Sequence, residues 1–232
     1  MFVCPGRAAY DRRVRDPAEL PDPPGPAEIR LASVADVPAL ALVLARAFAR
    51  DPMVTWPMVT DVDLVPRIRV MFEAVDTAFA AEGWMYEAGD ELGAMTLLPP
   101  DSEARQAELE AAASAAIDAL MPDAGERYRR MWSWIAETLP EERHWLLDQL
   151  AVEPAAQGRG IGGAILQFAI SRAEADHLPL YVETGMTANV AWYERFGFRV
   201  VIEGDAPGDG PHVWFMRRYP VARPFAAPRQ GR

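Results

Sequence analysis

Apolar residues in this chain follow two spacings, an alternation typical of strands and a repeat of three to four residues typical of helices. The run 28–32 alternates, whereas 37–49 carries Leu40, Val43 and Leu44 at helical spacing. Both kinds of run recur along the chain, which predicts an α/β fold with a mixed central sheet and helices on both faces. The predicted strands are 28–32, 84–88, 92–98, 145–152, 180–182, 198–202 and 213–216, and the predicted helices are 37–49, 64–80, 161–175 and 190–196.

A further helical segment, residues 101–140, precedes the strongest strand pattern, residues 145–152. Its first part is rich in Ala and Glu and its second part is aromatic, and Pro122 and Gly125 divide the segment into two helices. We therefore expect a helical insertion between two strands of one sheet.

The chain is long enough for one generous domain, which we place at residues 28–219. Residues 1–27 are rich in proline, and the tail 220–232 is interrupted by prolines in the same way. Proline disrupts both helices and central strands, so these two ends are predicted to be irregular extensions.

The charge composition argues against a nucleic-acid partner. Lys+Arg 23 against Asp+Glu 34 gives a formal net charge of -11 at pH 7, whereas proteins that bind nucleic acid present basic surfaces. An acidic surface is expected to favour cationic partners instead.

Cysteine and histidine are too few for several kinds of site. The single cysteine, Cys4, excludes an internal disulfide framework and a multi-cysteine metal site, and three widely spaced histidines argue against a His-ligated metal. No segment has the apolar run of a membrane span or a signal peptide. The sequence thus predicts a cytoplasmic protein with no metal and no membrane partner, either a monomer or a homodimer.

The strand at 145–152 runs into a glycine-rich turn that opens the helix at 161–175. Glycines let a phosphate approach backbone N–H groups, and the helix dipole favours an anion there, to which Arg159 adds positive charge. A plainer alternative is that the glycines only allow close packing of helix on sheet. The Gly-Lys-Ser/Thr ending of a P-loop is absent, and a dinucleotide-binding turn would be expected in the first strand–helix unit.

Two motifs resemble the Gcn5-related N-acetyltransferase (GNAT) family. The segment 157–162 matches the Gln/Arg-x-x-Gly-x-Gly/Ala signature that binds acyl-CoA in that family, and 189–198 is similar to the family's closing helix with its Tyr-Glu-x-x-Gly-Phe ending. The resemblance covers roughly residues 28–218 and extends toward the puromycin N-acetyltransferase branch, for example at Asp36-Val37-Pro38. It implies a mostly antiparallel sheet and acetyl-CoA as the cofactor.

The resemblance also implies where acetyl-CoA binds. In this family the strand before the turn separates from its neighbour, so the main chain of Leu150, Ala151 and Val152 would face the pantetheine. Asn189 is either a cofactor ligand or the N-cap of the helix that follows it. The pyrophosphate would be bound by the amides of Gln157, Gly158, Arg159, Gly160, Ile161 and Gly162.

The resemblance implies Tyr193 as the proton donor to the departing thiolate, because a phenol with a pKa near 10 stays protonated at neutral pH. The alternative is a Tyr193 that only packs in the core. For the general base the first candidate is Asp148 on the strand and the second is Glu183 at the end of the next strand, and a surface or hydrogen-bonded carboxylate is the alternative for both. Glu153 is expected to be solvated.

Aromatic and Met residues of the insertion and of the loop 53–59 are candidates for an apolar acceptor pocket. Their helical spacing also fits packing of the insertion on the sheet, and Trp56, in the loop, is the better candidate for the pocket. The full set is Met53, Trp56, Met58, Tyr128, Met131, Trp132 and Trp134.

These features together predict an acetyl-CoA-dependent N-acetyltransferase that acts on a primary amine of a small molecule by direct transfer in a ternary complex. Cys4 is too far from either motif to serve as a nucleophile. Two alternatives remain, namely a protein or peptide N-acetyltransferase with an open groove, and a non-catalytic acyl-CoA-binding regulatory module.

Overall fold

The computed structural model describes residues 28–58, 63–123 and 125–221. The predicted extension 1–27 lies outside the described residues, as does most of the predicted tail 220–232. The extent of the domain at both ends therefore stays a prediction.

The fold is built on one seven-stranded sheet with the strand order β1-β2-β3-β4-β5-β7-β6. Neighbouring strands are antiparallel except for β4 and β5, which run parallel. The predicted mixed and mostly antiparallel sheet is therefore confirmed. The strands are β1 (Ile29–Leu31), β2 (Met85–Ala88), β3 (Gly93–Leu98), β4 (Trp145–Val152), β5 (Leu180–Thr184), β6 (Arg199–Asp205) and β7 (His212–Arg218).

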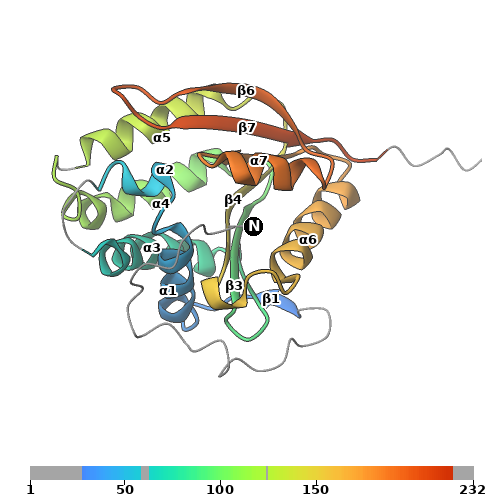
Figure 1. The fold of residues 1–232 in the computed structure, drawn as a ribbon, viewed down its shortest axis with the longest axis horizontal. Helices are drawn as coiled ribbons and strands as arrows, with labels where there is room; N and C mark the ends of the chain where they lie inside the picture. Colours follow the sequence, from blue (N-terminus) through green and yellow to red (C-terminus); the bar gives the residue numbers. More distant parts are fainter. Residues whose placement is uncertain (1–27, 59–62, 124, 222–232) are drawn as a thin grey trace, which may run out of the picture.

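Helices cover both faces of the sheet, as Figure 1 shows. On one side of β3 and β4 lie α1 and α3, and on the other side lies α6. The helices are α1 (Val37–Phe48), α2 (Pro52–Thr55), α3 (Leu64–Ala81), α4 (Glu103–Asp118), α5 (Glu126–Thr138), α6 (Ile161–Ala175) and α7 (Thr187–Glu194).

The two largest core clusters lie on opposite faces of the sheet. On one face, Leu40 and Leu44 of α1 pack with Phe72 and Phe79 of α3. On the other, the apolar stripe of α6 packs with Leu147 of β4. The helical spacing of these apolar residues in the sequence is thus explained by burial against the sheet.

The insertion forms the two helices α4 and α5, as predicted, and α5 is attached to β7. Met131 and Ile135 of α5 are buried with Phe215 of β7, and the Trp134 ring meets the Phe215 ring edge-on with centroids 5.6 Å apart. Met131 and Trp134 therefore have the packing role that their spacing allowed.

Two segments differ from the sequence prediction. Residues 52–55 form the short helix α2 instead of a loop, because the Asp51 side chain accepts a hydrogen bond from the Met53 N–H (2.8 Å) and Pro52 suits the first turn. The helix α7 begins at Thr187, so Asn189 lies inside it and is not its N-cap.

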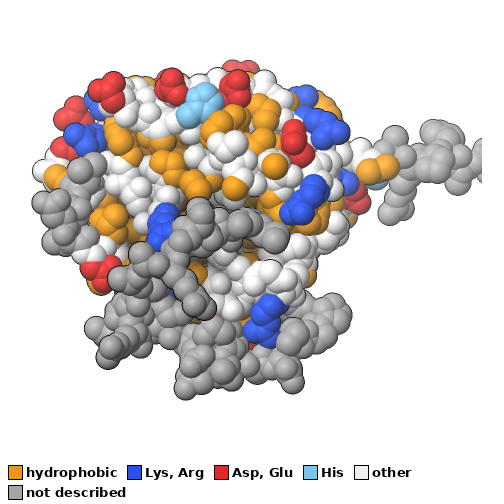
Figure 2. All heavy atoms as spheres, in the orientation of Figure 1, with side chains coloured by type: hydrophobic (Ala, Val, Ile, Leu, Met, Phe, Trp, Pro, Cys, Tyr) orange, Lys and Arg blue, Asp and Glu red, His pale blue; other side chains and the backbone are white. Residues whose placement is uncertain are grey.

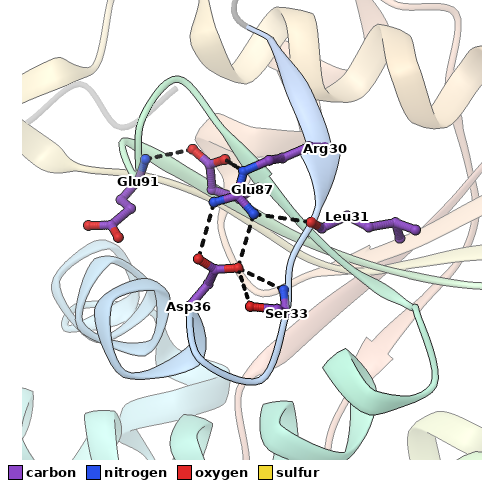
Figure 3. Close-up of polar contacts among 6 residues, drawn as sticks. All are labelled: Arg30, Leu31, Ser33, Asp36, Glu87 and Glu91. Carbon is purple, nitrogen blue, oxygen red and sulfur yellow. Dashed lines mark hydrogen bonds and ion pairs between the residues drawn. The ribbon is translucent and has the colours of Figure 1, made fainter.

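A polar network connects β1, α1 and the hairpin of β2 and β3, as Figure 3 shows. The Arg30 guanidinium donates to both carboxylate oxygens of Asp36 (3.0 and 3.1 Å) and forms an ion pair with Glu87 (2.8 Å). Asp36 also accepts from the backbone N–H of Ser33 (2.7 Å), and these donors hold the pKa of Asp36 well below its usual range. The network secures the short edge strand β1 to the helix that follows it.

We expect Asp36→Asn to lower the free energy of unfolding at pH 7 by about 1–2 kcal/mol, because it removes the charge that Arg30 and Ser33 stabilise. A lowered pKa stabilises the fold above the unfolded-state value near 4, so the difference from the wild type should shrink as the pH falls below about 4. Urea unfolding measures both effects. Asp90→Asn, at an exposed turn, is the matched control, and a loss equal to that of the control would contradict the prediction.

Candidate active site

The site begins where β4 and β5 separate. The two parallel strands pair only at Trp145 with Leu180 and at Leu146 with Tyr181. Beyond these positions β4 continues to Val152 and remains paired with β3 alone. The backbone of β4 on the side of β5 is thus left without ladder partners over its second half.

A bulge in β4 lies just beyond this point. Leu97 of β3 faces Leu147, and the preceding Thr96 faces Gln149, so Asp148 has no partner in β3. The extra residue reverses the alternation, and Gln149 points to α3, where its Nε2 donates to Asp76 (3.1 Å). The bulge therefore places Asp148 beside the gap between β4 and β5.

One cavity, the glycine-turn cavity, lies along the second half of β4 and the start of α6. Its volume is about 440 Å³. Of the predicted cofactor residues, the described lining contains Leu150, Ala151, Val152, Gln157, Gly158, Gly160, Ile161, Gly162 and Asn189, but not Arg159. The sequence analysis missed Trp192, Arg195 and Phe196, which also line it.

The glycine-rich turn has a backbone that only glycine adopts readily. Gly158 and Gly160 have φ values of 80° and 88°, in the left-handed region. The Gln157 side chain fastens the turn to the strand by donating to the Val152 carbonyl (3.2 Å). Because α6 begins at Ile161, its first backbone N–H groups have no intrahelical acceptors and are suited to an anion.

A second cavity, the acidic cavity, lies between β4, β5 and the helices α1 to α5, with a volume of about 90 Å³. Four carboxyl side chains line it, and its remaining walls are largely apolar. The carboxyls are Asp51, Glu110, Asp148 and Glu183, and the apolar or aromatic residues include Met53, Met71, Phe72, Phe79, Tyr128 and Trp132.

Burial raises the pKa of each of these carboxyls. For Asp148 burial and the charge of Glu110 raise the pKa to about 7, and for Asp51 burial raises it to about 6. The pKa of Glu183 is raised well above its usual value by burial and then by the charge of Asp148. At neutral pH, Asp148 is therefore divided between its protonated and ionised forms.

The two cavities share the lining residues Leu150, Asn189 and Tyr193. Tyr193 is 6% exposed, and its ring packs against Trp192 and Phe198. Burial and the charges of Glu183 and Asp51 raise its pKa above the usual value, so its hydroxyl stays protonated. The Asn189 side chain donates to the Thr184 hydroxyl (3.0 Å).

Two sequence predictions are wrong. Glu153 is not solvated but buried, and it forms an ion pair with Arg46 (3.2 Å). Trp56 is not in the described lining of either cavity. It closes α2 and packs with the cluster around Phe215, while the Arg127 guanidinium lies 5.6 Å from its ring centroid.

Of the other pocket candidates, Met53, Tyr128 and Trp132 line the acidic cavity, whereas Met58 is buried in the core around α1 and α3. The sequence analysis missed Asp51, Glu110 and Gln149. Asp51 followed by Pro52 is a capping signal that could have drawn attention to that carboxyl.

Asp148→Asn tests whether a charge is buried here. A raised pKa means that the folded state loses stability as the pH rises from the unfolded value near 4 to about 7. Removing the charge should therefore raise the free energy of unfolding by about 1–3 kcal/mol more at pH 8 than at pH 5. Urea unfolding at both pH values measures the difference, with the exposed Asp209→Asn as control. If Asp148→Asn changed the free energy of unfolding equally at the two pH values, the prediction of a buried charge would be contradicted.

Known proteins share both this fold and this segment. Residues 127–200, from α5 to β6, match the family model described as the acetyltransferase (GNAT) domain. A Corynebacterium glutamicum structure described as "histone acetyltransferase HPA2 and related acetyltransferase" is 25% identical, with a TM-score of 0.63 over 86% of this chain and 98% of its own.

Two insect enzymes share the fold at lower identity. The polyamine N-acetyltransferase of Drosophila melanogaster is 16% identical, with a TM-score of 0.58 over 83% of this chain and 99% of its own. The arylalkylamine N-acetyltransferase 2 of Aedes aegypti is 11% identical, with a TM-score of 0.58 over 83% and 98%. These comparisons show that residues 127–200 resemble the acetyltransferase (GNAT) domain and that the chain shares the fold of these acetyltransferases, which supports an acetyl-CoA-dependent N-acetyltransferase.

Proposed function

We propose that the chain transfers an acetyl group from acetyl-CoA to a primary amine of a small molecule, with both substrates bound together. The observation that carries the proposal is that the glycine-turn cavity and the acidic cavity meet at Leu150, Asn189 and Tyr193. One cavity suits a donor that carries phosphate and the other suits a cationic acceptor. Their shared wall is where the reacting atoms of the two substrates would meet.

The residues of the glycine-turn cavity fit acetyl-CoA, which supplies the acetyl group as a thioester. The open edge of β4 at Leu150, Ala151 and Val152 offers main-chain groups to the amides of the pantetheine. The left-handed Gly158 and Gly160 wrap the turn so that backbone N–H groups receive the pyrophosphate. Arg159 is not part of this lining and would add positive charge near the pyrophosphate. Asn189 would bind the cofactor from the wall that the two cavities share.

We assign Asp148 as the general base that accepts the proton of the incoming amine. An alkylammonium ion must lose a proton before its nitrogen can attack, and a base is most effective when its pKa lies near the working pH. The pKa of Asp148 is about 7. Burial and the charge of Asp148 raise the pKa of Glu183 well above its usual value, and Glu183 would position the amine as a hydrogen-bonding partner.

We assign Tyr193 as the proton donor to the departing thiolate. Its hydroxyl keeps its proton at every physiological pH, because burial and two neighbouring carboxyls raise its pKa. Since Tyr193 lines both cavities, it can donate to a sulfur at the end of one cavity while an acceptor occupies the other. Its packing against Trp192 and Phe198 would hold the ring in place.

A small acceptor is favoured over a peptide by the walls of the acidic cavity. The insertion supplies Glu110, Tyr128 and Trp132, and the segment at α2 supplies Asp51 and Met53. Together with α3 these elements border the space in front of β4 on several sides. A protein or peptide N-acetyltransferase would be expected to have an open groove at this place instead.

The test is a CoA-release assay over a panel of amines, with Tyr193→Phe as the variant and Tyr219→Phe as the matched control. Tyr219 is 54% exposed and lies away from both described linings. We expect amine-dependent CoA release by the wild type and the control. Tyr193→Phe should lower kcat about 100-fold, because general acid catalysis typically contributes that much or more.

The panel contains monoamines, diamines, aminonucleosides such as puromycin, and peptides with free N-termini. The sequence has no lysine, so acetylation of the enzyme's own lysines cannot add to the signal. Unchanged turnover by Tyr193→Phe would overturn its role as proton donor. Binding of acetyl-CoA with no release for any amine would favour the non-catalytic binding module.

A further inference from the structure

The carboxyls of the acidic cavity come from different elements, for example Glu183 from β5, Asp148 from β4 and Glu110 from the insertion helix α4. The charges that raise the pKa of Tyr193 are those of Glu183 and Asp51. Those that raise the pKa of Tyr128, on the insertion, are led by Glu110 and Asp148. Asp148 also raises the pKa of Glu183. We call the wall at Tyr193 of α7 the reactive end of the cavity, and the wall that the insertion forms with Glu110 of α4 and Tyr128 of α5 its distal end.

Within the described residues, no Arg or His forms an ion pair with any of the four carboxyls that line this cavity. The Glu110 carboxylate is oriented by the side chain of Gln106, one turn earlier on α4, which donates to its Oε1 (2.9 Å). Negative charge that is buried and unpaired is costly, and a cation that enters the cavity would offset that cost.

Three buried polar atoms of residues that line the cavity lack a hydrogen-bond partner, namely two acceptors and one donor, the Trp132 Nε1. Gln149 is 9% exposed, and its buried Oε1 has no hydrogen-bond partner, although its Nε2 is bound to Asp76. The buried Oε2 of Glu183 lacks a partner as well. Both residues line the cavity, so an amine bound there would lie close to acceptors that lack a donor.

The distal end also has aromatic walls. Tyr128 and Trp132 of α5 line it with ring centroids 6.0 Å apart. Aromatic faces attract ammonium ions, and the attraction is stronger where water is excluded. In the described part of the chain, no group of three or more His, Cys, Asp or Glu residues is placed to hold a metal ion. The origin of the four carboxyls in different elements of the wall fits an elongated organic cation better.

We propose that the acceptor is a linear diamine or polyamine, with its reacting amine at Tyr193 and a second ammonium group at Glu110 beside Tyr128 and Trp132. This inference rests on the proposed function and adds the class of its acceptor. Glu110 is then a specificity residue, and the insertion supplies the part of the site that recognises the second ammonium group. The second ammonium remains bound throughout the transfer and takes no part in the proton transfer to Asp148.

The test compares diamines of increasing chain length with monoamines of the same length, by kcat/KM for CoA release. We expect at least one diamine to exceed its matched monoamine by about tenfold or more, mainly through a lower KM, since the second ammonium adds a buried charge pair. Glu110→Gln should bring the ratio close to one. Glu108→Gln, an exposed neighbour on the same helix, should keep the wild-type ratio.

Circular dichroism and thermal unfolding establish that the variants are folded before the ratios are compared. Monoamines and diamines that react equally well with the wild type would overturn the inference and leave the proposed function intact. An unchanged ratio in Glu110→Gln would overturn the role of that residue. No turnover of any amine would instead overturn the proposed function.

Discussion

The separation of β4 from β5 after two paired positions is the constraint on which the site depends. A continuous ladder would occupy the backbone of β4 and close the space between the two sheet halves. The separation leaves that backbone open, and the bulge at Asp148 places a carboxyl beside the gap. The glycine turn and α7 then border the gap from two sides, so Tyr193 faces both cavities.

Electrostatics divides the site into two unlike halves. Backbone N–H groups at the start of α6 attract an anion, while the four carboxyls of the other cavity disfavour one. On the face shown in Figure 2, acidic side chains also lie along the rim near α5 and β6, where Glu203 and Asp205 are exposed. The net charge of -11 is thus in keeping with a cationic acceptor and does not prevent local binding of phosphate.

Much of the fold could be predicted because apolar periodicity is a local property. The strand β4 and the helix α6 have the bounds that their patterns predicted, and the glycine motif identified one cavity. The acidic cavity could not be assembled in this way, since Asp51, Glu110 and Gln149 meet only through tertiary packing. The bulge at Asp148 likewise depends on the pairing of β4 with β3, whereas the short helix that turns Trp56 away follows from the local capping signal of Asp51 and Pro52.

In the proposed mechanism, donor and acceptor occupy the two cavities at once and meet beside Tyr193. A conjugate that joins the sulfur of CoA to a diamine through an acetyl bridge tests this most directly by isothermal titration calorimetry. We expect one conjugate to bind per chain, at least about 100-fold more tightly than CoA alone. The diamine part would enter the acidic cavity without further loss of translational freedom. Affinity equal to that of CoA would contradict it.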